Sequence, residues 1–141
     1  MTQTSLITGI TGQDGFYLAS SLVARGVSVI GTTRTLDGAA LRLGSDLAKQ
    51  VELVEWDLVD ADRFADILSE YKPAQIYNLA AFTSGEFMNR DAARVTDING
   101  VAVLRILEAM RHIDPAIRFC QASSSEIFAG TGVSPQDEGT P

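Results

Sequence analysis

The chain has 141 residues, of which 45% are hydrophobic, and it carries a formal net charge of −7. This length predicts one domain with a sizeable core, and the acidic balance excludes an extended phosphate-neutralising surface, so we expect no nucleic-acid partner. The sequence has a single cysteine, Cys120, which excludes an intramolecular disulfide. It has neither a signal-peptide pattern nor an apolar run of membrane-spanning length, and these features together predict a cytoplasmic protein.

Short β-rich runs alternate with helical patterns along the chain. Apolar runs predict strands at residues 5–8, 27–33, 51–56, 75–79 and 118–122. Helical periodicity predicts helices at 14–25, 61–71 and 92–112, with a short helical piece within 39–49. This alternation predicts an α/β fold, a Rossmann-type doubly wound parallel sheet of about five strands without a separate substrate domain. Because the last residues, 136–141, are a polar loop, we expect the domain over 1–141 to be incomplete at its C-terminal end.

A glycine-rich turn separates the first expected strand from the first expected helix. Its glycines, Gly9, Gly12 and Gly15, follow a Gly-x-x-Gly-x-x-Gly spacing. Backbone N–H groups and the positive helix end can take a pyrophosphate there, and the absent side chains allow close approach. The turn therefore supplies the candidate cofactor residues Gly9, Thr11, Gly12, Gln13, Asp14 and Gly15. The alternative is a helix-start turn that uses glycine only for its backbone angles.

The end of the second expected strand bears on the choice of dinucleotide. Residues 31–35, Gly-Thr-Thr-Arg-Thr, contain a cation and hydroxyls but no carboxylate. A carboxylate there would favour NAD, whereas the guanidinium of Arg34 matches a 2′-phosphate and favours NADP. NAD stays open, because Arg34 is equally consistent with a solvated surface arginine.

Two further strand ends supply candidate cofactor residues. Asp57 and Leu58 follow the third strand, where Asp57 can accept a hydrogen bond from an adenine amine or cap a nearby helix. Leu79, Ala80 and Ala81 close the fourth strand, where small residues let a cofactor lie close to the backbone. The alternative for the alanines is simple tight packing.

The expected helix at 92–112 is apolar on more than one side, which predicts deep burial or self-association through this helix. Asn99 is a polar residue in it, and we expect its amide to support the site by pinning a neighbouring strand end.

The fifth strand ends at Ser123-Ser124-Ser125-Glu126, which places hydroxyls and a carboxylate at the carboxyl edge of the sheet. They suit substrate chemistry there, although serine runs also form ordinary turns. His112, the only histidine, ends a helix, so no Ser-His-Asp arrangement is predicted, and no metal-ligand cluster is present in the sequence.

Several segments resemble the extended short-chain dehydrogenase/reductases that act on nucleotide sugars (the NAD-dependent epimerase/dehydratase family), and among them the GDP-mannose 4,6-dehydratases. The matching segments are residues 7–15, 76–81, 107–109, 119–126 and 135–141. Within the first of them the pair Gln13-Asp14 is more specific than the glycines. The resemblance implies a Rossmann fold and an enzyme that retains NADP through its reaction cycle. In that cycle C4 of the sugar is oxidised, water is lost across C5 and C6, and the hydride returns to C6.

The resemblance also implies residue roles. Ser124 stands at the position of a hydroxyl that hydrogen-bonds near the C4 oxygen, and Glu126 stands at that of the acid/base at C5 and C6. Arg34 matches a 2′-phosphate position, while Thr35 replaces a neighbouring family arginine.

Two departures from the family pattern leave alternatives open. Residues 82–87 differ from the family's substrate loop, which leaves the sugar nucleotide open, and the sequence contains no Tyr-x-x-x-Lys pair. We therefore expect the chain to be the N-terminal, NADP-binding portion of such an enzyme, inactive alone, with the nucleotide sugar bound by the full-length parent. The alternatives are an epimerase or reductase of the same superfamily, or a non-catalytic dinucleotide-binding module.

Overall fold

The protein was analysed as a computed structural model that describes residues 3–83 and 90–140. The strands are β1 (Thr4–Thr8), β2 (Ser28–Thr33), β3 (Val51–Glu55), β4 (Gln75–Asn78) and β5 (Arg118–Gln121). The helices are α1 (Gln13–Ala24), α2 (Ala39–Leu43), α3 (Ser45–Ala48), α4 (Ala61–Tyr71), α6 (Ala92–Thr96), the π-helix η1 (Asp97–Val101), α7 (Ala102–Ile113) and the 3₁₀-helix η2 (Ser125–Phe128). All five predicted strands are present, with ends shifted by one residue. The predicted piece within 39–49 is two short helices separated by Gly44, whose φ of 75° ends the first. Residues 84–87 of the divergent loop lie outside the described residues.

The five strands form one parallel sheet in the order β3-β2-β1-β4-β5. Thr8 lies opposite Thr32 of β2 and Asn78 of β4, and Asn78 lies opposite Gln121 of β5. The carboxyl ends of four strands therefore meet at one edge. This strand order is that of a Rossmann-type sheet, so the predicted fold class is confirmed.

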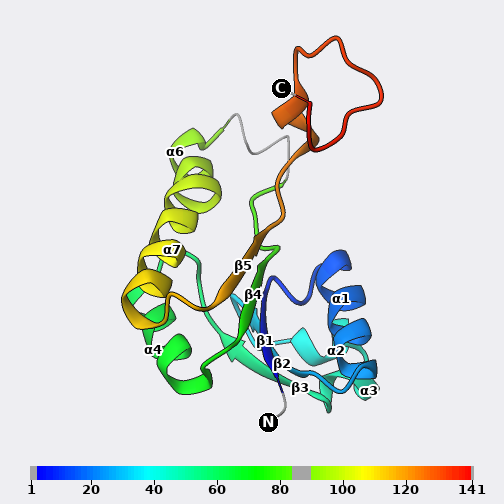
Figure 1. Cartoon of the computed structure of the whole chain (residues 1–141). Coiled ribbons are helices and arrows are strands. Elements are labelled where there is room, and N and C mark those ends of the chain that lie inside the picture. The colour runs from blue at the N-terminus through cyan, green and yellow to red at the C-terminus, as the bar shows by residue number, and fades with distance from the viewer. Residues whose placement is uncertain (1–2, 84–89, 141) are drawn as a thin grey trace.

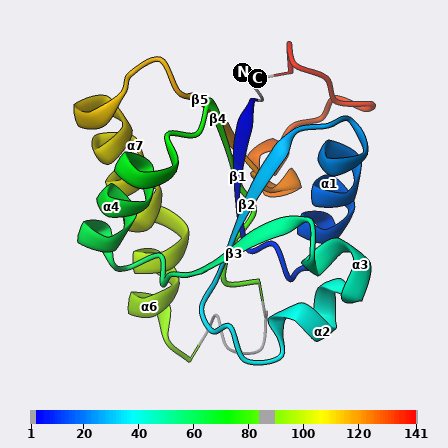
Figure 2. The same ribbon diagram turned by 90° about the horizontal axis from the view of Figure 1, so that it is seen from below.

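Helices cover both faces of the sheet (Figures 1 and 2). Helices α1, α2 and α3 lie on one face and α4, α6 and α7 on the other. Successive side chains of β1 point to opposite faces, so Leu6 packs in the cluster that holds Phe64 and Ile106, whereas Ile7 packs with Leu22. After β5, the orange-to-red segment projects away from the sheet (Figure 1).

The predicted helix at 92–112 is interrupted by η1, so that α6, η1 and α7 follow one another without a loop. Its inward side consists of Ile98, Ala102, Ile106 and Met110, all buried. On the opposite side Val101, Leu104 and Leu107 are exposed, Leu104 to 59%. Full burial is therefore wrong for this helix, and self-association through it stays a prediction.

Replacing Leu104 by Glu tests that prediction. If two copies pair through this side of α7, a carboxylate in the contact would have to lose its water, and the assembly should dissociate. Because Leu104 is exposed, the free energy of unfolding of the monomer should change by no more than about 0.5 kcal/mol. Sedimentation velocity of both proteins at several concentrations measures the effect, and a monomeric unsubstituted chain would refute self-association.

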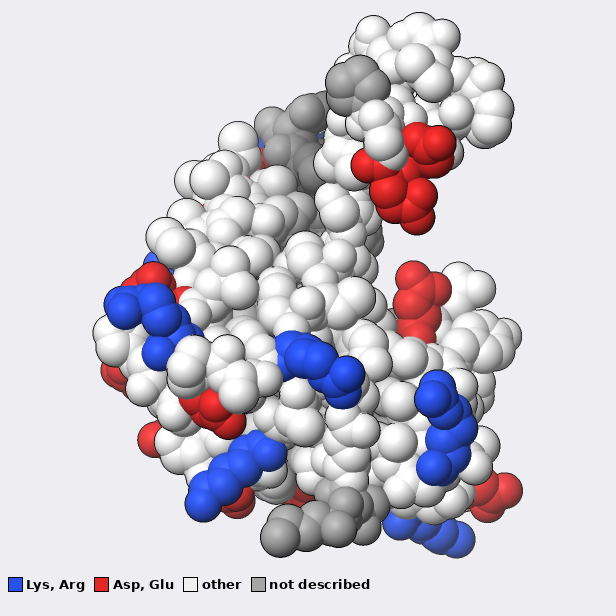
Figure 3. Space-filling view, viewed as in Figure 1, with Lys and Arg blue, Asp and Glu red and all other residues white. Residues whose placement is uncertain are grey.

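No helix in residues 3–83 and 90–140 is long and apolar enough to span a bilayer. On the face drawn in Figure 3, Lys and Arg side chains occupy separate positions and are interspersed with Asp and Glu.

Candidate dinucleotide site

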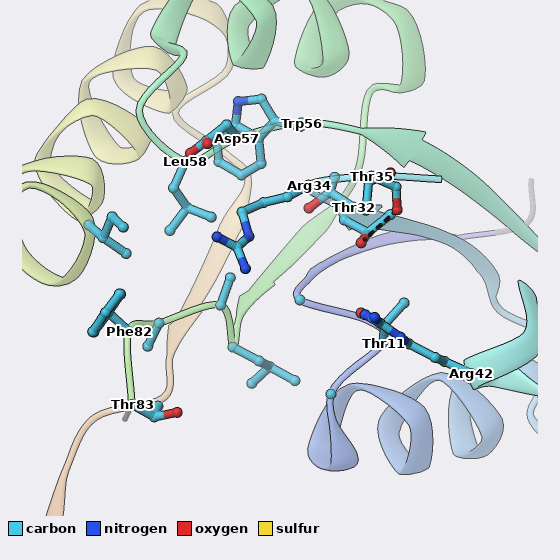
Figure 4. Close-up of a pocket in the computed structure, with 17 residues that line it drawn as sticks. Thr11, Thr32, Arg34, Thr35, Arg42, Trp56, Asp57, Leu58, Phe82 and Thr83 are labelled. Atoms are coloured by element: carbon cyan, nitrogen blue, oxygen red, sulfur yellow. Dashed lines mark hydrogen bonds between the residues drawn. The ribbon is translucent and has the colours of Figure 1, made fainter. Parts of the chain in front are cut away.

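A pocket of about 430 Å³ lies at the carboxyl edge of the sheet (Figure 4). This volume falls within the range of small-molecule sites. It is lined by the last two residues of β2 and by segments that follow β1, β2, β3 and β4, together with one residue each from α2 and η1. The lining residues are Gly9, Thr11, Gly12, Thr32, Thr33, Arg34, Thr35, Arg42, Trp56, Asp57, Leu58, Leu79, Ala80, Ala81, Phe82, Thr83 and Ile98. Nine of the candidate cofactor residues are among them: Gly9, Thr11, Gly12, Arg34, Asp57, Leu58, Leu79, Ala80 and Ala81.

The glycine turn forms one wall of this pocket, and its backbone fits a phosphate. Gly9 has a φ of 68°, and a Cβ placed on it would lie 3.0 Å from the Cα of Ala80. Gly12 is the N-cap of α1 and supplies no side-chain acceptor to the first turn of the helix. The N–H groups at this helix end thus lack the usual capping oxygen, and an anion is the ligand that such an end favours.

The other three turn candidates lie in the first turn of α1, outside the pocket lining. Gln13 and Asp14 are exposed, and Gly15 is buried. A Cβ on Gly15 would lie 2.6 Å from the carbonyl oxygen of Gly9, so the glycine lets α1 start directly on the turn.

A chain of hydrogen bonds, which runs from the buried Thr8 and Asn78 to the exposed Gln121, links β1, β4 and β5 beneath the pocket. The Thr8 hydroxyl donates to Asn78 Oδ1 at 2.6 Å and accepts the N–H groups of Leu79 and Ala80 at 3.1 and 3.0 Å. Asn78 Nδ2 donates to Gln121 Oε1 at 2.8 Å, and Gln121 Nε2 donates to the Ala122 carbonyl at 2.8 Å. This chain holds the backbone of Leu79 and Ala80, which line the pocket.

Two arginines reach the pocket from different elements. Arg34 follows β2 and Arg42 belongs to α2, and both side chains enter the site in Figure 4. Within the described part of the chain, neither guanidinium makes a hydrogen bond or an ion pair. Two cations without a partner among the described residues, in a chain with a net charge of −7, favour an anion at this end of the pocket.

The third strand end brings Trp56, Asp57 and Leu58 to the part of the pocket beside Arg34, where the Trp56 N–H donates to the Thr33 carbonyl at 2.8 Å (Figure 4). The Asp57 carboxylate accepts the Val59 N–H at 3.3 Å. The N-cap of α4 is Asp60, which accepts the Arg63 N–H at 2.9 Å. The helix-cap interpretation of Asp57 is therefore wrong, because Asp57 stands three residues too early and closes a turn instead.

Asn99 lies in η1 and does not line the pocket. Its Oδ1 accepts the Phe82 N–H at 2.7 Å, and its Nδ2 donates to the Phe82 carbonyl at 3.0 Å. The amide thus holds both backbone groups of a residue that does line the pocket, four residues after the end of β4. Single π-helical turns within α-helices occur frequently at functional sites. Here the π-helical turn contains the Asn99 amide that binds Phe82.

Ser124 and Glu126 follow β5, beyond the pocket. Ser124 is the N-cap of η2, and its Oγ accepts the Glu126 N–H at 3.2 Å. Both residues are exposed and neither lines the pocket. Among the residues that the structure describes, no group of three or more His, Cys, Asp and Glu side chains is placed to hold a metal ion.

The candidate cofactor residues did not include several lining residues, notably Thr32, Thr33, Arg42, Trp56 and Phe82. The strand-end position of the two threonines and of Trp56 was a usable signal, since ligands of open α/β sheets bind there. Arg42 carried no such signal, because a short helix between strands gives no indication of which way its side chains point.

Comparisons with known proteins agree with this fold. The family model described as GDP-mannose 4,6 dehydratase matches residues 6–141. The chain is 36% identical to the human GDP-mannose 4,6 dehydratase over 97% of its own length, and 35% identical to that of Vibrio cholerae over 100%. It spans 40% of the length of each of these relatives. A crystal structure of UDP-glucose-4-epimerase from Stenotrophomonas maltophila with bound NAD superposes with a TM-score of 0.84 at 20% identity, covering 98% of this chain and 42% of that one.

Proposed function

Because the chain belongs to the GDP-mannose 4,6 dehydratase family, we propose that it is the NADP-binding portion of a nucleotide-sugar dehydratase that acts on GDP-mannose. One observation carries the proposal: the pocket joins a helix start without a side-chain cap, an arginine after β2 that has no partner among the described residues, and small residues after β4. These are the parts that a Rossmann site uses for a dinucleotide. The UDP-glucose-4-epimerase structure with the same fold has NAD bound, which supports a dinucleotide as the ligand.

In this proposal each wall of the pocket holds one part of the cofactor. The N–H groups of the Gly9–Gly12 turn and of the start of α1 bind the pyrophosphate, and Arg34 binds the 2′-phosphate. Asp57 and Leu58 border the adenine, with the Asp57 carboxylate as acceptor for its amine. Ala80 lets the cofactor approach the end of β4, where a larger side chain would intrude.

Bound NADP supplies a hydride acceptor and donor for the sugar, and the chain's own residues supply binding, orientation and proton transfer. Glu126 takes the C5 proton and returns a proton to the departing C6 hydroxyl, and Ser124 donates a hydrogen bond near the C4 oxygen. Both lie on the segment that projects beyond β5. No Tyr in the sequence is followed four positions later by Lys, so we propose that these 141 residues bind NADP without turning over the sugar nucleotide. We place this binding in the cytoplasm.

A titration of the 141-residue chain with NADP and with NAD tests the proposal. We expect saturable binding of NADP and weaker binding of NAD, measured by calorimetry. Arg34→Ala should weaken NADP by at least about tenfold, because it removes a charge-assisted hydrogen bond, and should leave NAD nearly unchanged. Tighter binding of NAD than of NADP would reject NADP as the cofactor, and the absence of binding for both would reject the proposed function.

A further inference from the structure

The second arginine of the pocket, Arg42, has no role in the function proposed above. It lies on α2, between Ala39 and Leu43, which are 1% and 2% exposed and anchor this short helix to the core. This anchoring fixes the side from which Arg42 leaves the helix. In the view of Figure 4 its side chain runs from α2 toward Thr11 of the glycine turn, while Arg34 enters the pocket from the end of β2.

The segment between the two arginines is held in place by its own hydrogen bonds. The Glu55 carboxylate accepts the Leu36 N–H at 3.2 Å. The Thr35 hydroxyl accepts the Asp37 N–H at 3.2 Å, and the Thr35 carbonyl accepts the Thr33 hydroxyl at 3.2 Å. The segment is thus tied to β3 by the Glu55 carboxylate and held internally by the polar groups of Thr35.

Among the charged side chains that line the pocket, the two guanidinium groups of Arg34 and Arg42 outnumber the one carboxylate, Asp57. Like charges that face one cavity without partners repel each other, and an anion between them relieves the repulsion. A ribose 2′-phosphate carries nearly two negative charges at neutral pH and three acceptor oxygens, which suits two guanidinium donors. The uncapped start of α1 already provides neutral N–H donors for the pyrophosphate.

We propose that Arg42 is a specificity-determining residue that, together with Arg34, clamps the 2′-phosphate and so selects NADP over NAD. The inference rests on the proposed dinucleotide site and adds to it a second 2′-phosphate ligand, contributed by α2.

Calorimetric titration of Arg42→Ala with NADP and NAD tests this assignment. We expect NADP to bind about tenfold more weakly and NAD to change by less than about twofold, because NAD lacks the group that Arg42 contacts. Arg42→Lys should lose part of the NADP affinity, since it keeps the charge without the planar fork. Arg25→Ala is the matched control: Arg25 is an exposed arginine at the opposite end of α1, so its removal changes the net charge equally without touching the pocket.

The outcomes separate this inference from the proposed function. Equal weakening of NADP and NAD by Arg42→Ala would place Arg42 at the pyrophosphate and overturn the clamp. Unchanged NADP affinity in Arg42→Ala, with tight binding by the unsubstituted chain, would overturn the role of Arg42 alone. An unsubstituted chain that binds neither dinucleotide would overturn the site and the clamp together. Far-ultraviolet circular dichroism confirms that each variant is folded before its titration.

Discussion

Gly15→Ala is expected to destabilise the fold by about 2–3 kcal/mol and to abolish measurable NADP binding. In an ordinary helix the same change stabilises by about 0.5–1 kcal/mol, because alanine loses less backbone entropy on folding. Here a Cβ would lie 2.6 Å from the Gly9 carbonyl oxygen, and 2.7 and 2.8 Å from the Cα and carbonyl oxygen of Ile10. All three atoms belong to the backbone, so no side-chain rotation can relieve the contact, and overpacking of this kind costs about 1–3 kcal/mol or more.

The loss of binding follows from what must move. The added methyl group can be accommodated only if the start of α1 shifts away from the Gly9–Gly12 turn, and that shift changes the positions of the N–H groups that we assign to the pyrophosphate. Urea denaturation gives the free energy of unfolding, and calorimetry gives the affinity for NADP.

Gly100→Ala provides the comparison for Gly15→Ala. Gly100 is also helical, lies in η1, and has no heavy atom within 4 Å of the position of an added Cβ. It should be neutral or slightly stabilising and should keep NADP binding. A Gly15→Ala protein with unchanged stability and unchanged NADP affinity would show that the direct packing of α1 on the turn is not needed for the site.

The parts of the fold that could be predicted from sequence are those with a local signal. Apolar runs located the five strands, and the glycine spacing located the wall of the pocket formed by Gly9 and Gly12. The strand-end positions of Arg34 and Leu58 were enough to predict that they line the pocket, because the carboxyl ends of all strands in a parallel sheet lie at one edge.

The parts that could not be predicted depend on which strands become neighbours. Gly31 illustrates this: a Cβ there would collide with the side chain of Ile10, but the packing of Ile10 over β2 is visible only in the fold. The hydrogen bonds of Thr8 to residues 70–72 positions later have the same origin. The π-helical turn at Asn99 is likewise a tertiary feature, because the hydrophobic periodicity of 92–112 predicts an uninterrupted helix.

Thr8→Val is expected to destabilise the protein by about 3 kcal/mol, although the two side chains have nearly the same shape. Thr8 and Asn78 are 0% and 1% exposed. Valine would leave three polar groups without a partner: the N–H groups of Leu79 and Ala80, and Asn78 Oδ1. A buried group that loses its partner costs about 1–3 kcal/mol, and the two half-buried N–H groups recover part of this from water in the pocket.

The direction of each hydrogen bond makes this effect specific to the hydroxyl. Both lone pairs of Thr8 Oγ1 are used by the two N–H groups, so its proton must go to Asn78 Oδ1. That bond fixes the orientation of the Asn78 amide, whose Nδ2 then donates to Gln121 Oε1. Removing the hydroxyl therefore releases the end of β4 and also the orientation of the amides that connect it to β5.

Amide hydrogen exchange measures this effect at the bonds themselves. In Thr8→Val the Leu79 and Ala80 amides should exchange at least about tenfold faster, relative to the Ile30 amide in β2, than in the unsubstituted protein. Thr8→Ser keeps the hydroxyl and should preserve their relative protection, although it loses stability through the deleted methyl group. If Thr8→Val left both amides as protected as before, backbone geometry alone would hold this strand end, and the Thr8 hydroxyl would have no part in shaping the pocket.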